Sequence, residues 1–256
     1  MQGLRRLVLT LLTSLFLTGF ASAETIRVTT WNLQWFPSGS QNRAAPEQEE
    51  AKIRQAAEVI TILNPDVLLL QEVRDWEACQ KLADALKPMQ YHVAVCSTFR
   101  DSVGGAVGWQ QVAILSKRHA QAAWAARWST KGVVDLPRGF AFSVFRWGSI
   151  DVGFYSVHLK SNLVRGNNER AVQLNILKRE LAAEQLVAHT ADVQKSFPGT
   201  LRAFVAGGDF NTNKDESTFV SERTLDIFND AGFLNPFSSL KKVKRFTHPG
   251  KGRYPD

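Results

Sequence analysis

Near its C-terminal end the sequence places a carboxylate and an amide two positions apart, directly after an apolar run. Residues 203–206 have the composition of a β-strand, and Gly207, Gly208, Asp209, Phe210 and Asn211 follow them. Because side chains alternate along a strand, Asp209 and Asn211 would project to one side and Phe210 to the other, into packing. The two glycines would let the backbone or a ligand approach closely. By itself the segment fits a catalytic strand end and a solvated turn equally well.

Three other apolar runs end with a polar side chain that could take part in catalysis. They are Asn32 after the run 26–31, Glu72 after the run 67–70, and His158 at the end of the run 150–158. Taken singly, Asn32 fits a turn residue, Glu72 a surface acid and His158 a core histidine. Four such strand ends in one chain favour a site assembled where the ends meet.

The apolar periodicity alternates between the patterns of strands and helices. Strands are expected at 26–31, 67–70, 91–96, 111–115, 140–147, 150–158 and 203–206, and helices at 47–63, 76–86, 168–189 and 219–229. Strands 140–147 and 150–158 should pair as a hairpin across Gly148 and Ser149. Hairpin-linked strands in the middle and helix-linked strands at both ends predict an α/β fold with mixed sheets, and no linker divides it.

Two of the expected helices carry an apolar face. The residues expected to face inward are Ile53, Ala57, Ile60 and Leu63 in the helix 47–63, and Leu174, Leu177, Leu181 and Val187 in the helix 168–189. Asn168 is expected to cap the second of these helices.

The N-terminus has the organisation of a secretory signal peptide. Arg5 and Arg6 precede an uncharged apolar stretch at 7–20, and the small residues 21–23 match a signal-peptidase site. The apolar stretch is shorter than the ~20 residues that a membrane-spanning helix needs. We therefore expect residues 1–23 to be removed and residues 24–256 to form a single exported domain, periplasmic or secreted. An uncleaved signal anchor is the alternative.

Charge and cysteine content agree with export. Without residues 1–23 the chain keeps 29 basic and 24 acidic side chains, a formal charge of +5. Such a charge favours polyanionic partners, although many basic exported proteins simply stay soluble in this way. Cys79 and Cys96 could meet across a helix–strand corner, and we expect a disulfide rather than two free thiols. No further cysteine and no paired histidine stands at the spacing of a zinc site.

Four motifs resemble, in the same order, those of the endonuclease/exonuclease/phosphatase superfamily, which includes pancreatic-type deoxyribonucleases, abasic-site endonucleases and lipid phosphodiesterases. The motifs are Thr30-Trp31-Asn32, Leu70-Gln71-Glu72-Val73, His158-Leu159-Lys160-Ser161 and Gly208-Asp209-Phe210-Asn211. The resemblance covers about residues 26–211. It implies a four-layer sandwich, in which two mixed β-sheets lie face to face with helices outside, and an active site at one end between the sheets.

The residue types agree with hydrolysis of a phosphodiester. Glu72 offers the oxygen ligand that Mg²⁺ or Mn²⁺ prefers, and the resemblance implies that Asn32 supports both metal and phosphate. Asp209 would orient the attacking water, and Asn211 would donate from its amide to the developing negative charge. A protonated His158 could donate to a phosphate oxygen.

Two further cations are candidates for substrate binding. Lys160 could contact a phosphate, and a solvent-facing lysine is the alternative. By resemblance, Arg170 and Gln173 correspond to family positions that contact or support the substrate.

One family motif is missing from the sequence. Family members end in a strand carrying an Asp-His pair, whose histidine binds the scissile phosphate or transfers a proton, and this chain stops at Asp256 before such a motif. His248 lies too early, in a Thr-His-Pro turn, to take that role. We expect the natural gene product to continue through the missing strand. The alternative is a protein that lacks the strand altogether.

Three functions remain open from the sequence. The first is an exported, metal-dependent nuclease that acts as a monomer, without a stable protein partner. The second is a phospholipid or inositol-phosphate hydrolase, which would need an exposed aromatic hairpin for membrane contact, with Trp124, Trp128 and Trp147 as candidates. The third is a binding protein that keeps the fold without catalysis.

Overall fold

The computed structural model describes residues 24–101, 105–164, 166, 168–241, 244, 245 and 247. Its strands are β1 (Val28–Phe36), β2 (Val67–Val73), β3 (His92–Cys96), β4 (Gln111–Ser116), β5 (Ala122–Arg127), β6 (Gly139–Trp147), β7 (Ile150–His158) and β8 (Leu201–Asp209). Its helices are α2 (Pro46–Leu63), α3 (Trp76–Ala85), α4 (Glu169–Ser196), the 3₁₀ turn η1 (Ser217–Phe219) and α5 (Thr224–Asp230).

The strands form two four-stranded sheets, with the orders β1-β2-β4-β3 and β5-β6-β7-β8. Each sheet contains one parallel pair, β1 with β2 and β7 with β8, and its other pairs are antiparallel. A helix joins the two strands of each parallel pair, α2 in the first case and α4 in the second, as a parallel connection requires. Both sheets are therefore mixed, as the sequence predicts.

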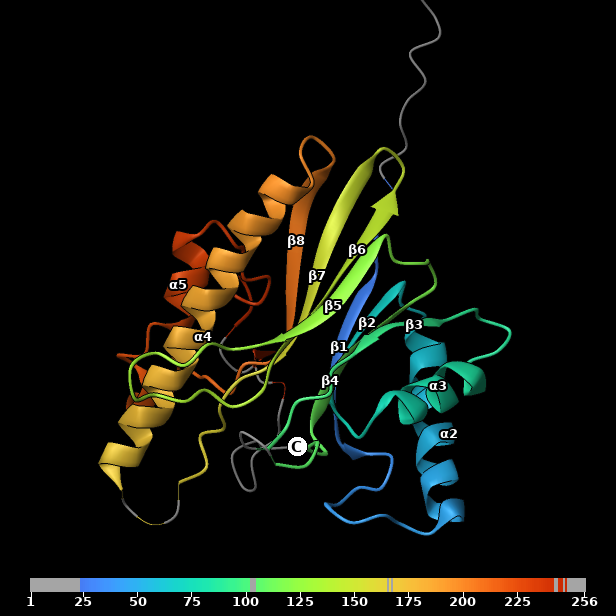
Figure 1. Cartoon of the computed structure of the whole chain (residues 1–256), viewed down its shortest axis with the longest axis horizontal. Helices are drawn as coiled ribbons and strands as arrows, with labels where there is room; N and C mark the ends of the chain where they lie inside the picture. Colours follow the sequence, from blue (N-terminus) through green and yellow to red (C-terminus); the bar gives the residue numbers. More distant parts are fainter. Residues whose placement is uncertain are drawn as a thin grey trace, which may run out of the picture.

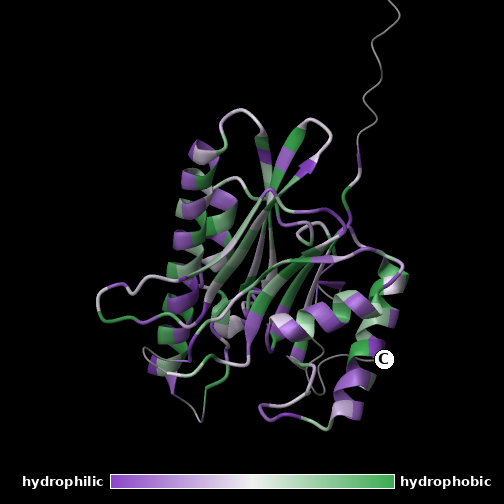
Figure 2. Ribbon diagram, turned by 45° about the vertical axis from the view of Figure 1, so that its right-hand side comes forward, coloured by the Kyte–Doolittle hydropathy of each residue, from purple (hydrophilic) through white to green (hydrophobic). Residues whose placement is uncertain are grey.

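The two sheets lie face to face, with α2 and α3 outside one of them and α4 and α5 outside the other (Figure 1). Three buried apolar clusters fill the spaces between these four layers. Hydrophobic residues run along the strands while hydrophilic residues concentrate on the helices (Figure 2). The expected four-layer sandwich is therefore confirmed.

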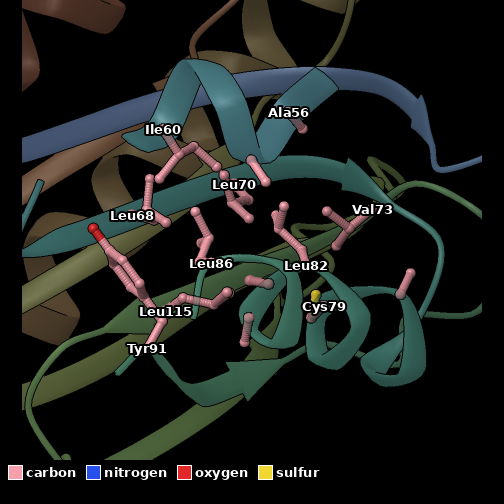
Figure 3. Packing of buried hydrophobic residues seen from close by; sticks show 14 of the residues in the cluster. Ala56, Ile60, Leu68, Leu70, Val73, Cys79, Leu82, Leu86, Tyr91 and Leu115 are labelled. Carbon is pink, nitrogen blue, oxygen red and sulfur yellow. The ribbon is translucent and has the colours of Figure 1, made fainter. Parts of the chain in front are cut away.

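The continuous apolar run of β2 is explained by layers on both of its faces. Leu68 and Leu70 belong to the cluster under α2 and α3, while Val67 and Leu69 belong to the cluster between the sheets. Figure 3 shows Leu68 and Leu70 beside Ile60 of α2. All four β2 side chains are fully buried, so truncating one to alanine would cost about 2–5 kcal/mol.

Several expectations about elements need correction. Strand β5 was not expected, because its Ala-Ala-Trp-Ala-Ala stretch lacks the β-branched residues typical of strands. Leu174 and Leu177 are 43% and 40% exposed and do not face inward, whereas Ile176 and Leu186 are buried. Leu63 is also 43% exposed at the end of its helix.

Other element boundaries differ from the expected ones, and two local features are as expected. Helix α4 extends to Ser196, beyond the expected end at 189, and the last expected helix is divided into η1 and α5. The hairpin across Gly148 is confirmed, with Trp147 opposite Ile150. The Asn168 cap is confirmed as well, since its side chain accepts a hydrogen bond from the Ala171 amide.

Cys79 and Cys96 lie together, but the structure has them as free thiols and not as the expected disulfide. A hydrogen bond with Cys96, followed by burial, raises the pKa of the Cys79 thiol. The Cys79 thiol is therefore held in the protonated form, which is the unreactive one.

Within the described part of the chain, no helix combines the length and apolar character needed to cross a membrane. The expected signal peptide at 1–23 and the residue His248 lie outside the described residues. Export therefore stays a prediction.

Candidate active site

The parallel pairing of β1 with β2 and of β7 with β8 brings the four predicted site residues together. Asn32 lies on β1, Glu72 on β2, His158 ends β7 and Asp209 ends β8. The carboxyl ends of parallel strands lie at the same edge of a sheet, which is where open α/β sheets bind ligands. Here the edges of two face-to-face sheets coincide, so one side chain from each of four strands enters a single cluster.

Asn32 joins the two carboxylates of the cluster. Its Nδ2 donates to Glu72 Oε1 at 3.0 Å and to Asp209 Oδ2 at 2.9 Å. Its Oδ1 accepts from the backbone N–H of Gln34 at 3.0 Å. The Nδ2 atom of Asn32 therefore holds one carboxylate from each sheet, Glu72 and Asp209, at hydrogen-bonding distance.

A bulge in β2 aims the side chain of Glu72. The pairing of β2 with β4 shifts between Gln71 and Val73, and Glu72 has a left-handed φ of 56°. A bulged residue of this kind leaves the strand alternation, and a non-glycine residue at positive φ carries strain. The carboxylate, 12% exposed, also accepts from the backbone N–H of Trp35 at 3.2 Å. Strain at Glu72 is typical of a residue held for function.

His158 lies between the two acids and is nearly inaccessible. Its Nε2 is 3.8 Å from Glu72 Oε1 and 3.7 Å from Asp209 Oδ2, and its side chain is 4% exposed. Burial, and then the charges of Arg138 and Lys160, lower the pKa of His158 to about 3. The imidazole is therefore neutral near pH 7, with one N–H to donate, whereas the sequence analysis considered the protonated form.

Asp209 is the more accessible acid, with 31% of its side chain exposed. Its Oδ1 accepts from the backbone N–H of Asn211 at 3.1 Å, which forms a turn at the end of β8. Asn211 has a φ of 52°, so it leaves the strand alternation, and its Nδ2 donates to the Leu159 carbonyl at 3.3 Å. Phe210 packs against Phe228 as expected, with ring centroids 5.5 Å apart.

Gly208 is required where β8 passes β7. A Cβ at this position would lie 2.0 Å from the carbonyl oxygen of Val157, and its φ is 154°. Gly207 allows a different contact, since a Cβ there would meet Leu69 of the facing sheet at 2.6 Å. The glycine pair thus brings Asp209 close to both β7 and the opposite sheet.

Arg138 is a site residue that the sequence analysis missed. Its Nε and Nη2 donate to the carbonyls of His158 and Leu159 at 3.0 and 2.9 Å, and its Nη1 donates to Gln110 Oε1 at 3.0 Å. Burial lowers the pKa of Arg138, and the nearby charges of Glu72 and Asp209 act in the opposite direction. The signal was present in the hairpin: pairing Trp147 with Ile150 places residue 138 opposite residue 159.

Lys160 and Arg170 occupy different positions. Lys160 is partly buried, and burial, followed by the charges of Arg138, Lys178 and Arg179, lowers its pKa. That environment places a cation beside the cluster. Arg170 and Gln173 are exposed in the first turns of α4, and the contacts of the described residues do not join them to the cluster.

A buried polar link fixes the two sheets just below the site. Gln71 Nε2 donates to Ser156 Oγ and to the Leu69 carbonyl, both at 2.9 Å, and Ser156 Oγ donates to the Leu70 carbonyl at 2.9 Å. Gln71 and Ser156 directly precede the site segments of β2 and β7. The relative position of Glu72 and His158 is therefore set by hydrogen bonds as well as by packing.

Polar atoms without partners gather in the same place. Among the described residues, four buried side-chain polar atoms lack a hydrogen-bond partner, and three of them belong to His158 (Nδ1), Asn162 (Oδ1) and Thr212 (Oγ1). These residues lie at the ends of β7 and β8 or just beyond them. Because buried polar groups are nearly always satisfied, their concentration here indicates a site that interacts with something outside the chain.

The donor set fits a hard divalent cation. Within the described part of the chain, no group of three or more His, Cys, Asp or Glu side chains is placed to hold a metal ion. Glu72 and Asp209 nevertheless bring two carboxylates into one cluster, and Mg²⁺ is held by one or two carboxylates while it keeps several waters. Members of this fold family generally use divalent metals.

Comparisons with known proteins agree with this geometry. The model of the Endonuclease/Exonuclease/phosphatase family matches residues 29–253. No curated protein sequence matches the chain significantly.

Solved structures with a similar fold include sphingomyelinase C from Streptomyces griseocarneus, with a TM-score of 0.58 and 18% identity, over 83% of this chain and 72% of that one. The β-hairpin deletion mutant of β toxin from Staphylococcus aureus has a TM-score of 0.55 and 17% identity, over 82% of this chain and 74% of the toxin. Truncated TDP2 from Caenorhabditis elegans has a TM-score of 0.50 and 18% identity, over 74% of this chain.

This chain spans 64% of the truncated TDP2 chain, less than two thirds of its length. At these identities the structural matches establish the fold alone, and the family match covers most of the sequence. The chain belongs to the Endonuclease/Exonuclease/phosphatase family.

Proposed function

We propose that this protein is an exported, Mg²⁺- or Mn²⁺-dependent nuclease that hydrolyses phosphodiester bonds of nucleic acid. The observation that carries the proposal is the convergence of Asn32, Glu72, His158 and Asp209 in one cluster at the meeting strand ends. Arg138 and Lys160 lie beside that cluster. Two acids next to two cations suit a phosphodiester, which brings a negative charge and needs an activated water.

Each residue has a role that its surroundings support. Glu72 and Asn32 would hold the cation, which supplies charge neutralisation at the phosphate when bound. Asp209 is the acid that solvent reaches most easily, and it would accept a proton from the attacking water. Neutral His158 would donate its single N–H to a phosphate oxygen. Asn211, whose amide already donates to the Leu159 carbonyl, would support the turn that carries Asp209.

Lys160 supports a nucleic-acid substrate by its position rather than by contacts in the free protein. Among the ion pairs of the described residues, none includes Lys160, and burial, followed by repulsion from neighbouring cations, lowers its pKa. A phosphate would relieve that repulsion. Arg170, exposed in the first turn of α4, would contact a more distant part of the substrate.

The tryptophans argue against the lipid alternative. Trp128 and Trp147 are 5% and 4% exposed, and Trp124 packs against Phe142 with ring centroids 4.6 Å apart. These three residues therefore form no exposed aromatic hairpin for insertion into a membrane. The resemblance to sphingomyelinase C and β toxin keeps a phospholipid headgroup as the substrate to test against.

The proposal is tested with the full-length protein, plasmid DNA and Mg²⁺. Nicking that EDTA abolishes and that added Mg²⁺ restores is the expected result. Parallel reactions contain sphingomyelin or phosphatidylinositol vesicles instead of DNA. Release of phosphorylated headgroup without nicking would replace the nuclease proposal by the lipid one. Binding of DNA without cleavage of any substrate would favour the non-catalytic alternative.

A further inference from the structure

A second cationic site lies along the side of the sandwich formed by the edge strands β3 and β5, opposite the side formed by β1 and β8. The edge strands β3 and β5 adjoin there, and the segments at their ends enclose a cavity of about 280 Å³ lined by Thr98, Phe99, Arg100, Ala125 and Arg127. Arg100 follows β3, and Arg127 is the last residue of β5. The cavity therefore takes one arginine from each sheet.

Neither arginine is neutralised. Arg127 Nη1 donates to the Arg100 carbonyl at 2.8 Å, and Arg100 Nη1 donates to the Gly105 carbonyl. Both acceptors are uncharged backbone groups. Among the described residues, no carboxylate lies within ion-pair distance of either guanidinium. The two charges are thus held next to one cavity with most of their N–H donors unused.

The backbone that carries both arginines is held in place. Buried Gln111 accepts from the Phe99 N–H at 2.7 Å and donates to the carbonyls of Phe99 and Gly108 at 2.9 and 2.7 Å. Opposite Arg127 stands Gly139, where a Cβ would lie 1.9 Å from the Ala126 carbonyl oxygen. Fixed backbones make the cavity a preformed feature rather than a chance arrangement of surface side chains.

Strand pairing places this cavity on the same end of the molecule as the catalytic cluster. Arg127 is opposite Gly139 on β6, and Phe140 is opposite Val157 on β7, so Arg127 lies two strands from His158. At a strand spacing of ~4.8 Å, that separation is about 10 Å. Arg138, which precedes β6, lies between them. A line of cations therefore leads from the catalytic acids to the cavity.

We propose that Arg100 and Arg127 form a second phosphate-binding subsite, which holds a backbone phosphate of a polymeric substrate away from the bond being cleaved. The inference rests on the proposed nuclease function. A distance of about 10 Å is of the order of the separation between nearby backbone phosphates of one strand, whose axial rise alone is about 3.4 Å per nucleotide. The headgroups of sphingomyelin and phosphatidylinositol carry no second phosphate, so this subsite would not serve them.

The test compares two substrates in the full-length protein. The double variant Arg100→Gln/Arg127→Gln is assayed on a DNA oligonucleotide and on bis(p-nitrophenyl) phosphate, which is too small to reach the cavity. The ratio of the two kcat/KM values should fall about 10-fold or more, and the salt dependence of oligonucleotide binding should weaken by about one to two units of log–log slope. The variant Arg100→Lys/Arg127→Lys, which keeps both charges, should recover most of the ratio.

The matched control is Arg202→Gln, an exposed arginine at the opposite end of the same sheet as β5. It removes one exposed positive charge, against two in the double variant, without touching the cavity. A double variant whose ratio and salt slope equal those of Arg202→Gln would overturn the subsite while leaving the nuclease function standing. A wild-type protein that cleaves the small diester and not DNA would overturn both proposals.

Discussion

The candidate active site includes the last residues of β7 and β8, the buried pair Arg179–Glu222 lies on segments that follow these strands, and the two regions differ in how their charges are satisfied. Arg179, on α4, donates from Nε and Nη2 to Glu222 at 2.7 and 2.5 Å, and both side chains are completely buried. Arg179 Nη1 donates to the Lys160 carbonyl at 3.0 Å, and Thr224 donates to Glu222 at 2.6 Å.

In the catalytic cluster, by contrast, the polar side chains are only partly satisfied by hydrogen bonds. His158 Nδ1 is buried without a partner among the described residues, and Asp209 remains 31% exposed. A satisfied buried ion pair fixes structure, whereas unsatisfied groups at a strained backbone position indicate interaction with a ligand. The two regions are connected, because the Arg179 side chain holds the carbonyl of Lys160 at the edge of the site.

The largest expected effect separates chemistry from folding at Glu72. Glu72→Gln keeps the shape of the side chain and removes its charge, so metal-dependent hydrolysis should fall at least about 10³-fold. The thermal midpoint should change little. The matched control is Glu77→Gln, an exposed acid on α3 that pairs with Lys81. Activity within about tenfold of wild type would contradict a metal-holding role for Glu72.

The opposite outcome is expected for the buried pair. Glu222→Gln would leave the Arg179 charge buried without a counter-charge, which should lower the free energy of unfolding by about 3–5 kcal/mol. Urea unfolding measures this loss. The apolar double variant Arg179→Met/Glu222→Leu should recover much of it, because neither charge then remains buried. If the double variant were less stable than either single variant, the attraction between Arg179 and Glu222 would exceed the cost of desolvating the two charges.

Arg138 tests the boundary between the two regions, since it is both satisfied and close to the cluster. Arg138→Lys should lose the paired hydrogen bonds to the His158 and Leu159 carbonyls, and kcat/KM should fall about 10- to 100-fold, equivalent to 1.5–3 kcal/mol. Arg146→Lys, at the far end of β6, is the control. Equal activities of the two variants would show that Arg138 has no positioning role.

The smallest expected effect is on the pH dependence of stability, and it comes from His189, which lies outside both regions. Burial lowers the pKa of His189, whose Nδ1 is 2.8 Å from the Tyr155 hydroxyl. A lowered folded-state pKa means that the unfolded chain binds the proton more readily. The stability from neutral His189 is therefore present above pH 6.5 and is lost as the pH falls below it.

Urea unfolding between pH 8 and pH 5 measures this loss, with His189→Gln as the comparison. The variant should show a shallower decrease in stability towards low pH, although His158 and His92, whose pKa values are also lowered, still contribute. Identical pH dependence in the two proteins would exclude His189 as a source.

The sequence was informative wherever a local pattern carries the structure. The alternation of strand and helix patterns predicted the mixed sheets, and the apolar run at 67–70 predicted the strand β2. The polar residues at four strand ends predicted the members of the cluster. Patterns failed where burial is set by a distant partner, as for Leu174 and Leu177 on α4 or for the alanine-rich strand β5.

By itself, the sequence determined that Asn32, Glu72, His158 and Asp209 end or follow apolar runs, because such runs are local signals; β1 itself continues past Asn32 to Phe36. Only the tertiary structure decided that Asn32 holds an acid from each sheet, that the bulge at Glu72 aims its carboxylate, and that Arg138 supports His158. The physical reason is that these contacts cross between strands and sheets far apart in the chain. Their geometry depends on the packing of two sheets, which one strand's sequence does not encode.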